Sequence, residues 1–152
     1  MSETNFTYVI KQVELALRPY IEAVCADIGM TPAQYTALTV LERRPGITTS
    51  NLARRSFVRA QSMAQTVDPL LHAGLVRRTR DPEHARRLLL HLTEAGSEVI
   101  ARARPAVAAV EQLILADFTA DESAAFADFL SRVRRSLDGG VPAGRVMTPE
   151  TR

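Results

Sequence analysis

The chain has 152 residues, a formal net charge of +2 and one cysteine, Cys25. A chain of this length can bury a core without disulfides or a structural metal, and a single cysteine is typical of a reducing compartment. The sequence shows neither a basic and apolar leader nor an apolar run of the roughly 20 residues that a membrane span needs. We therefore expect one cytoplasmic domain over residues 1–152, with no membrane contact.

Apolar residues recur every three or four positions near the start of the chain, which predicts an amphipathic helix over residues 5–28. Pro19 lies inside this helix and is expected to kink it. The sequence TPAQ at residues 31–34 is typical of a capping box with proline at the first helical position. It predicts a second helix that ends near Arg44, before a proline and a glycine.

Two further helices follow in the central part of the chain. A threonine or serine can cap the first, over residues 48–55, and Gly74 is expected to end the second, over residues 59–73, as its C′ residue. Pro69 lies in the later half of the second helix, where a tolerated kink is expected. The side of that helix expected to be buried consists of Met63, Val67, Leu70 and Leu71.

The chain then changes character. Residues 75–79 and 87–93 are β-compatible runs on either side of a polar DPEH turn, which predicts a hairpin. Residues 93–117 predict a long helix that begins at a threonine able to cap it, and a capping box opens another helix that reaches residue 137. The remaining stretch, 138–152, has no periodicity and is expected to be a mobile tail.

The charges are distributed unevenly along the sequence. Ten arginines but only three acidic residues lie between Arg43 and Arg87, so this segment carries +7 and the rest of the chain −5. Such segregation suggests that the segment faces a polyanion, although a solvated basic face would have the same composition. Arg43 and Arg44 can equally be charges placed favourably at a helix C-terminus.

The order of the predicted elements is helix, helix, helix, helix, hairpin, helix, helix. A short helix, a turn, a second helix and a basic hairpin form a winged helix-turn-helix, and the +7 segment coincides with this unit. We therefore expect a mainly α fold with a small β-hairpin wing, which binds double-stranded DNA. The alternatives are an architectural DNA-binding protein without sequence preference and a winged-helix module for protein contacts.

The helix over residues 59–73 is expected to be the recognition helix, with its first turns at the bases. Gln61 and Gln65 share one face, and a glutamine amide can bond adenine N6 and N7 together, while Ser62 suits a base or a phosphate. Arginines of the hairpin suit phosphates or a narrow minor groove, and Arg86 lies nearest the expected wing tip. The candidate DNA-binding residues are Arg54, Arg55, Arg59, Gln61, Ser62, Gln65, Arg78, Arg80, Arg86 and Arg87.

Sequence signals for other chemistry are weak. The chain has no G-x-S-x-G, P-loop or dinucleotide motif, and its acidic residues show no pairing, so we expect no enzyme, no catalytic residue and no cofactor. His72, His84 and His91 together with Cys25 match no spacing typical of metal ligands, and no metal site is expected.

Three blocks of the sequence resemble successive blocks of the MarR family of bacterial winged helix-turn-helix transcription regulators: TPAQYTALTVLERRPGITTSNLAR, AQSMAQTVDPLLHAGLVRR and DPEHARRLLLHLTEAG. The resemblance marks residues 30–96 as the winged helix-turn-helix lobe and the flanking helices, 5–28 and 97–137, as dimerisation helices. It implies an obligate homodimer on a pseudo-palindromic operator. The apolar faces of the terminal helices exceed what a small winged-helix core needs, which independently favours burial against a second subunit.

The resemblance also implies a repressor that leaves its operator when a small effector binds. An aromatic or phenolic compound is the expected effector class. The family places such a ligand between the dimerisation helices and the winged-helix lobe. The candidate lining residues in this chain are Tyr20, Val24 and Tyr35.

The sequence departs from the family pattern at two places. The family's wing turn often reads Asp-x-Arg, but His84 occupies the acid position here, so Arg86 is held less rigidly unless Asp81 or Glu83 substitutes. Peroxide-sensing members have a reactive cysteine near the start of the first helix, where this chain has none. Cys25 is expected instead to be a buried, inert thiol.

Overall fold

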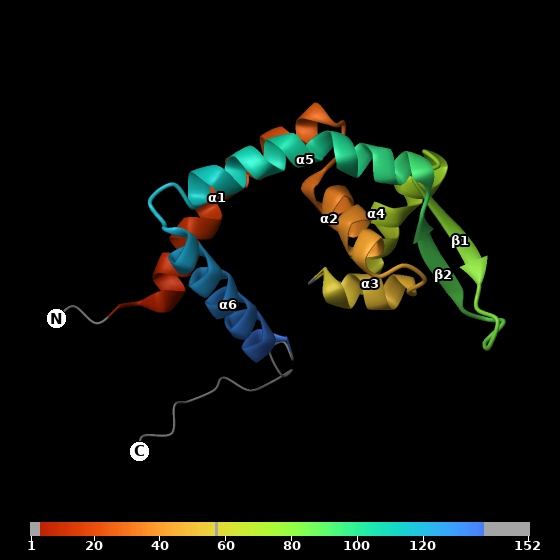
Figure 1. Cartoon of the computed structure of the whole chain (residues 1–152). Coiled ribbons are helices and arrows are strands. Elements are labelled where there is room, and N and C mark those ends of the chain that lie inside the picture. The colour runs from red at the N-terminus through yellow and green to blue at the C-terminus, as the bar shows by residue number, and fades with distance from the viewer. Residues whose placement is uncertain (1–3, 57, 139–152) are drawn as a thin grey trace, which may run out of the picture. The chain divides into compact units, whose positions relative to one another are not determined.

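A computed structural model describes residues 4–56 and 58–138 (Figure 1). The chain divides into two compact units, residues 1–111 and 112–152, which are described separately. The helices are α1 (Phe6–Asp27), α2 (Pro32–Arg43), α3 (Thr49–Arg55), α4 (Ala60–His72), α5 (Glu94–Ile114) and α6 (Ala120–Leu137). The strands are β1 (Val76–Arg80) and β2 (Leu88–Leu92), which pair antiparallel.

The helix starts follow the caps expected from the sequence. Thr31 accepts a hydrogen bond from the Gln34 backbone N–H, and the Gln34 side chain accepts one from the Thr31 backbone, so the predicted capping box of α2 is confirmed. The Thr48 side chain accepts a bond from the Asn51 N–H at the start of α3, and Thr93 Oγ1 accepts one from the Gly96 N–H at the start of α5. These bonds satisfy backbone donors that the first helical turn leaves open.

The end of α4 fixes where the wing begins. Gly74 has φ +71°, a left-handed conformation that glycine adopts without steric cost. Its N–H bonds the Leu71 carbonyl and the Leu75 N–H bonds the Leu70 carbonyl, which is the Schellman pattern of a helix end. The predicted C′ role of Gly74 is therefore confirmed, and β1 starts two residues later.

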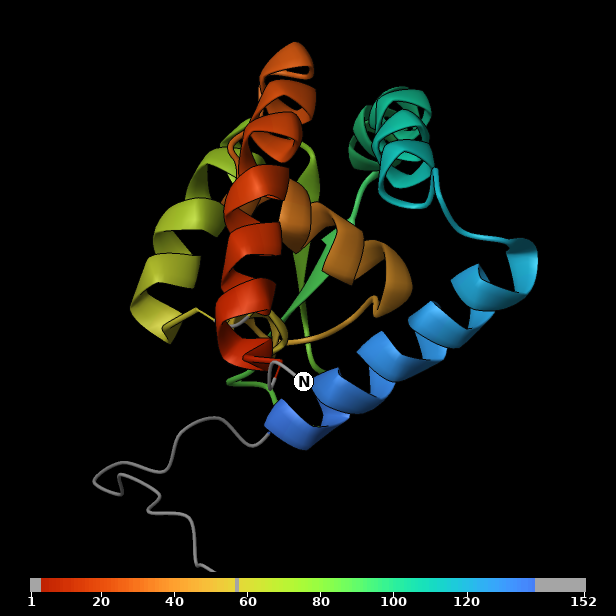
Figure 2. The same ribbon diagram turned by 90° about the vertical axis from the view of Figure 1, so that its left-hand side faces the viewer.

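The core of the first unit lies among α2, α3, α4, the base of the hairpin and the first half of α5 (Figures 1 and 2). Met63, Val67 and Leu70 are buried as predicted, and Leu71 is half-buried against the same core. The buried cluster consists of Ala37, Leu38, Leu41, Leu52, Ala53, Met63, Val67, Leu70, Leu75, Val76, Leu90, Val99 and Ile100. One shared core therefore holds the helix-turn-helix and the base of the wing together.

The hairpin has a third backbone partner that the sequence did not predict. Ile47, in the connection between α2 and α3, forms an isolated antiparallel bridge with Leu90 of β2. The Gly46 N–H also donates to the Leu90 carbonyl at 2.9 Å. Because a single bridging residue forms no periodic pattern, the sequence around Ile47 predicts only a turn. The bridge ties the wing to the start of the helix-turn-helix.

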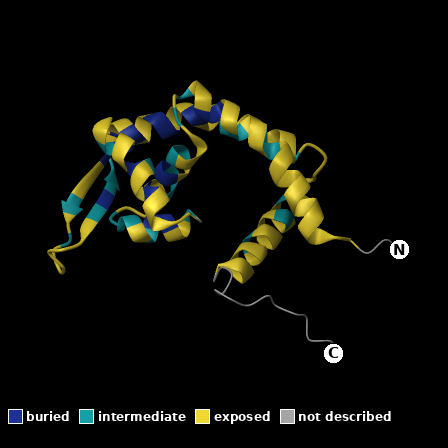
Figure 3. Ribbon diagram, turned by 180° about the vertical axis from the view of Figure 1, so that it is seen from behind, coloured by how far each residue is buried: buried dark blue, intermediate teal, exposed yellow. Residues whose placement is uncertain are grey.

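The terminal helices bury much less than the lobe does. In Figure 3, α1 and α6 are exposed along most of their length, and α6 contains no buried residue. In the second unit the rings of Phe118 and Phe126 meet edge to face, with centroids 5.3 Å apart. None of the helices in the described ranges is long and apolar enough to cross a membrane. The predicted tail lies outside the described residues except for Asp138.

These elements confirm the predicted fold class, a mainly helical winged helix-turn-helix with a small hairpin. Each predicted helix is present with ends within a few residues of the expected ones. Whether residues 1–152 act as one domain stays a prediction.

Candidate nucleic-acid interface

All ten candidate DNA-binding side chains belong to the first unit and are exposed. They come from α3, from the N-cap and first turns of α4, and from the two arms of the wing. Arg54 also donates a hydrogen bond to Asn51 Oδ1 at 2.8 Å. Since guanidinium groups in this unit are exposed on α3 and on the wing, both flanks of α4 can meet phosphates.

The exposed side of α4 begins directly at the helix start. Gln61, Ser62 and Gln65 are exposed, whereas Met63 and Val67 on the other side are buried in the core. The predicted division of this helix into a polar face and a core face is therefore confirmed. Arg59 is the N-cap residue and makes no side-chain cap bond, and its side chain is exposed.

Strand alternation sorts the arginines of β1 between the two faces of the hairpin. Arg78 and Arg80 share a face, and Arg77 lies on the other, opposite His91 in the register. Arg78 Nη2 lies 3.6 Å from Asp68 Oδ1 of α4. The ion pair links the wing to the recognition helix, and sequence analysis missed it because Asp68 lies ten residues upstream on another element.

The turn of the wing shows whether Asp81 or Glu83 replaces the acid that the family has at the position of His84. Asp81 Oδ1 accepts a hydrogen bond from the Glu83 N–H at 2.9 Å, and the Asp81 N–H donates to the Arg87 carbonyl. Asp81 thus shapes the turn. Among the residues that the structure describes, no ion pair joins an acid to Arg86. The Arg86 guanidinium is therefore available to a ligand.

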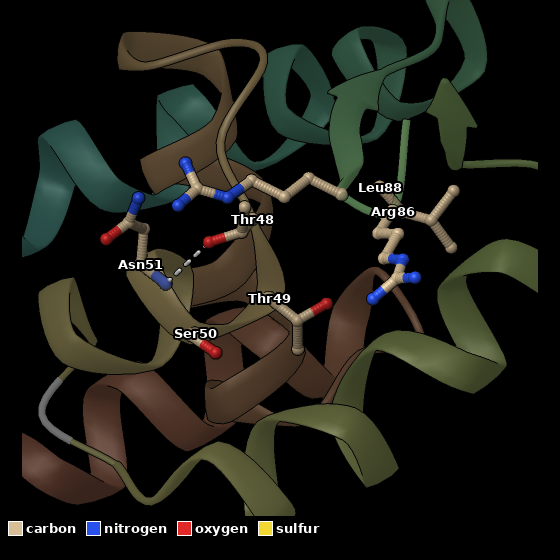
Figure 4. A pocket seen from close by; sticks show the side chains of 7 residues that line it. Thr48, Thr49, Ser50, Asn51, Arg86 and Leu88 are labelled. Atoms are coloured by element: carbon tan, nitrogen blue, oxygen red, sulfur yellow. Dashed lines mark hydrogen bonds between the residues drawn. The ribbon is translucent and has the colours of Figure 1, made fainter. Parts of the chain in front are cut away.

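A hollow of 540 Å³ lies between the start of α3 and the wing. Figure 4 shows Thr48, Thr49 and Asn51 on one side of it and Arg86 on the other. Its lining residues are Thr48, Thr49, Ser50, Asn51, Arg86, Arg87 and Leu88. Hydroxyl and guanidinium groups are the donors that proteins direct at DNA phosphates. Thr49, Ser50 and Asn51 at the start of α3 were not among the predicted DNA-binding residues, although the run of three hydroxyl residues at 48–50 is visible in the sequence.

A second pocket, of 330 Å³, lies between α2 and α5. Arg104 of α5 forms an ion pair with Glu42 of α2 at this pocket. Tyr35 lines it as well, and burial raises the pKa of the Tyr35 phenol, which stays a neutral hydrogen-bond donor. Tyr20 and Val24 do not line the pocket: Tyr20 is 49% exposed and Val24 is buried. The full lining is Tyr35, Thr39, Glu42, Arg43, Ile100, Arg104, Val107, Ala108 and Glu111.

The cysteine and the histidine of the hairpin lie in surroundings that favour a structural role. Cys25 is buried, and burial raises the pKa of its thiol, which disfavours the reactive thiolate. His91 Nε2 and Thr79 Oγ1 share a hydrogen bond of 2.9 Å across the hairpin. Within the described part of the chain, no group of three or more His, Cys, Asp or Glu side chains is arranged to hold a metal ion.

Comparisons with known proteins agree with this geometry. The model of the MarR family matches residues 28–87. The HTH-type transcriptional repressor Rv2887 of Mycobacterium tuberculosis is 30% identical over 126 residues, which cover 83% of this chain and 91% of the relative.

Two solved structures of other proteins share this fold, one bound to DNA and one bound to salicylic acid. The transcriptional repressor CouR bound to a 23-mer DNA duplex is 28% identical with a TM-score of 0.75, covering 85% of this chain and 92% of that one. The M. tuberculosis protein Rv2887 in complex with salicylic acid is 29% identical with a TM-score of 0.70, covering 87% and 98%. The match to the family model, the identity to a curated repressor across most of both chains and the shared fold agree, and the chain belongs to the MarR family of transcription regulators.

Proposed function

We propose that the protein is a dimeric transcriptional repressor that binds a pseudo-palindromic operator and leaves it when a small aromatic or phenolic effector binds. It acts in the cytoplasm, on DNA, and catalyses no reaction. The observation that carries this proposal is the exposed polar face of α4 flanked by exposed arginines on α3 and the wing. A relative with 28% identity was solved on a DNA duplex, which supports the same use of this surface.

In the proposed complex, α4 lies in the major groove and the remaining candidates contact the backbone or the minor groove. Gln61, Ser62 and Gln65 read bases, together with Arg59. The hollow between α3 and the wing receives a backbone phosphate, because its lining combines hydroxyl groups with Arg86 and the neighbouring arginine. The other arginines proposed to fix the register on the duplex are Arg54, Arg55, Arg78 and Arg80.

The test is a binding selection from random duplexes with the purified full chain, followed by titration of the selected duplex at several salt concentrations. A repressor of this kind enriches a two-fold symmetric motif and binds it at least about 1,000-fold more tightly than random duplex. Binding without discrimination would identify an architectural protein. Failure to bind duplex even at low salt would leave the fold as a module for protein contacts.

The apolar side chains of the terminal helices support the dimer. Phe6, Ile10 and Val13 on α1 are 72%, 55% and 56% exposed, and α6 exposes Phe129 and Leu137. Patches of this kind on a soluble chain are typical of protein interfaces. We propose that the helices within 5–28 and 97–137 of two chains interlock and, with the lobe over residues 30–96, act as one domain.

Sedimentation equilibrium tests the dimer directly. Val13→Glu places a charge on the exposed apolar face of α1 and is expected to shift the protein toward monomer and abolish operator binding. Gln12→Glu adds the same charge at a polar position on the same helix and serves as the control. A wild-type protein that sediments as a monomer while binding its operator tightly would refute the dimer.

The effector site that we propose is the pocket between α2 and α5. Its 330 Å³ lies within the range of small-molecule pockets, and it combines an aromatic ring, Tyr35, with the guanidinium of Arg104. A salicylic acid complex of a relative with 29% identity supports an aromatic acid as the effector class. A carboxylate bound to Arg104 places its aromatic ring between α2 and α5, and the bulk of the ring separates the two helices, which changes the spacing of the recognition helices in a dimer.

Salicylate titrated against the protein–operator complex is the probe for this site. We expect it to dissociate the complex of the wild-type protein, and Arg104→Ala to require at least a tenfold higher concentration. Arg102→Ala is the matched control, since Arg102 is exposed on the same helix and does not line the pocket. Equal sensitivity of the Arg104 and Arg102 variants would exclude this pocket.

A further inference from the structure

The exposed surface of the first two turns of α4 includes two amides and the methyl group of Ala64, beside the hydroxyl group of Ser62. Gln61, Ala64 and Gln65 are all exposed, and their i, i+3 and i+4 spacing makes them neighbours on the helix. The buried positions on the opposite side of these turns, Met63 and Val67, fix this face outward because both pack in the core of the lobe. The orientation of these three side chains therefore follows from the fold and not from the ligand.

The same helix lacks the groups that recognise guanine. No lysine or arginine occurs between Ala60 and His72, and the one acidic side chain, Asp68, is exposed and paired with Arg78. Guanine presents O6 and N7, two acceptors that Arg or Lys binds best, whereas an amide matches the acceptor and donor of adenine. The methyl group of thymine is contacted by small apolar side chains such as alanine.

We propose that the base pairs under the first two turns of α4 are A·T pairs in each half-site. Gln61 and Gln65 bond the N7 and N6 of adenines, and the Cβ of Ala64 contacts a thymine methyl group. The two glutamines lie roughly 6 Å apart along the helix axis, so they reach different base pairs. This inference rests on the proposed function and specifies which operators that function can use.

Arg59 is another exposed side chain that can contact a base, in competition with the glutamines. It is exposed at the N-cap and makes no side-chain cap bond, so its guanidinium is free of α4 itself. A guanine at the edge of the motif is compatible with this arginine and is expected to depend on it alone. The A·T pairs proposed here must instead depend on the glutamines and on the thymine methyl group.

The experiment begins with the binding selection on the wild-type protein and continues with modified operators. Replacing the contacted adenines by 7-deazaadenine removes N7, and replacing thymine by deoxyuridine removes the methyl group, while the protein stays unchanged. We expect a loss of about tenfold for each 7-deazaadenine and of a few-fold for deoxyuridine. Because the modification is in the DNA, the result does not depend on the folding of a variant.

Protein variants then assign each loss to a side chain. Gln65→Ala is expected to relax the selection at one position per half-site and to lose its sensitivity to 7-deazaadenine there. Ala64→Gly is expected to lose sensitivity to deoxyuridine. His72→Ala changes an exposed residue in the last turn of α4, away from the bases, and should retain the wild-type motif and both sensitivities.

The outcomes separate this inference from the proposed function. A symmetric motif with G·C pairs at the α4 positions, or an A·T preference that Gln65→Ala retains at every position, overturns the inference and leaves the repressor intact. A selection that enriches no motif overturns the proposed function itself. An enriched A·T core whose modified forms lose affinity as expected supports both.

Discussion

The recognition helix and the wing are neighbours on one core but differ in their chemistry. The first two turns of α4 carry no charged side chain, whereas the hairpin exposes five arginines. Phosphate contacts give affinity without sequence information, and base contacts give discrimination. In the proposed complex the two tasks are therefore divided, with affinity supplied mainly by the wing and α3 and discrimination mainly by α4.

This division requires that the two parts keep a fixed relative position. Val67 and Leu70 of α4 and Val76 of β1 are buried in the same cluster, and the left-handed Gly74 sets the angle at which the chain leaves the helix. The Ile47–Leu90 bridge holds β2 from the other side. A substitution on the exposed face of either part should therefore change its own task and leave the other unchanged.

The double substitution Arg86→Ala and Arg87→Ala is expected to have the largest effect. It should weaken binding to all duplexes by about 100-fold at physiological salt, because each lost phosphate contact lowers the salt slope by about 0.9. The bases selected under α4 should stay the same. Fluorescence anisotropy over a salt series measures both quantities, with Arg102→Ala as a control outside the interface.

Arg86→Ala alone separates the wing tip from the backbone contact. Because Arg86 is proposed to meet a backbone phosphate in the hollow beside α3, binding is expected to weaken by about tenfold, and a changed preference at the flanks of the operator would show that this arginine also enters the minor groove. Equal affinity of the Arg86 variant and the wild type in low salt would show that the wing does not bind DNA as proposed.

Gly96→Ala is expected to have the next largest effect. It should disturb the packing of α5 against the base of the hairpin and lower the free energy of unfolding. A Cβ at Gly96 would lie 2.3 Å from the Leu75 carbonyl oxygen and 2.7 Å from a Leu92 methyl group, so α5 must shift away from the base of the hairpin. The cost of such overpacking is about 1–3 kcal/mol and exceeds the gain in helix propensity from glycine to alanine. Urea unfolding measures the loss.

Ser97→Ala is the control for that substitution. Ser97 is exposed on the same turn of α5, and alanine there is expected to be neutral or slightly stabilising. A Gly96→Ala protein as stable as the wild type, with an unchanged salt slope, would mean that the wing tolerates movement relative to α4. The proposed division of tasks would then not need a rigid base.

The sequence predicted the fold almost completely because its signals are local. The capping residues Thr31, Thr48, Thr93 and Thr119 each accept a backbone bond within three residues, and the hydrophobic period of α4 separates its core side from its polar side. Such signals need no knowledge of the tertiary structure.

The parts that the sequence did not predict depend on contacts between distant residues. Glu42 and Arg104 are 62 positions apart, and the pocket that they share forms only when α2 and α5 pack together. For this reason the sequence could not show that Tyr35 lines this pocket and that Tyr20 and Val24, chosen by their place in α1, do not; whether an effector binds there stays a prediction. The pairing of Asp68 with Arg78 is a further case, since no local pattern joins a helix to the following strand.

Asp68→Asn is expected to have the smallest effect. It tests, by a change on α4, the proposed division between affinity from the wing and discrimination from α4. Asp68 is the acidic residue on the recognition helix, it is exposed, and its partner Arg78 lies on the wing. The amide removes a negative charge close to the phosphates and removes the carboxylate that competes with them for the Arg78 guanidinium. Binding to random duplex should therefore tighten by about threefold, with a smaller gain on the operator, so the specificity ratio falls.

Asp128→Asn is the matched control, because the Asp128 carboxylate on α6 is about as exposed as that of Asp68, its Oδ2 lies 3.7 Å from Arg132 Nη1, and the net charge changes by the same amount. Both substitutions should change the free energy of unfolding by less than about 0.5 kcal/mol, as is usual for exposed pairs. If the two variants bind random duplex equally, the charge of Asp68 has no local role at the interface. If only Asp68→Asn lowers the ratio of operator affinity to random-duplex affinity, the negative charge of Asp68 weakens non-specific binding through the wing and so preserves the specificity of α4.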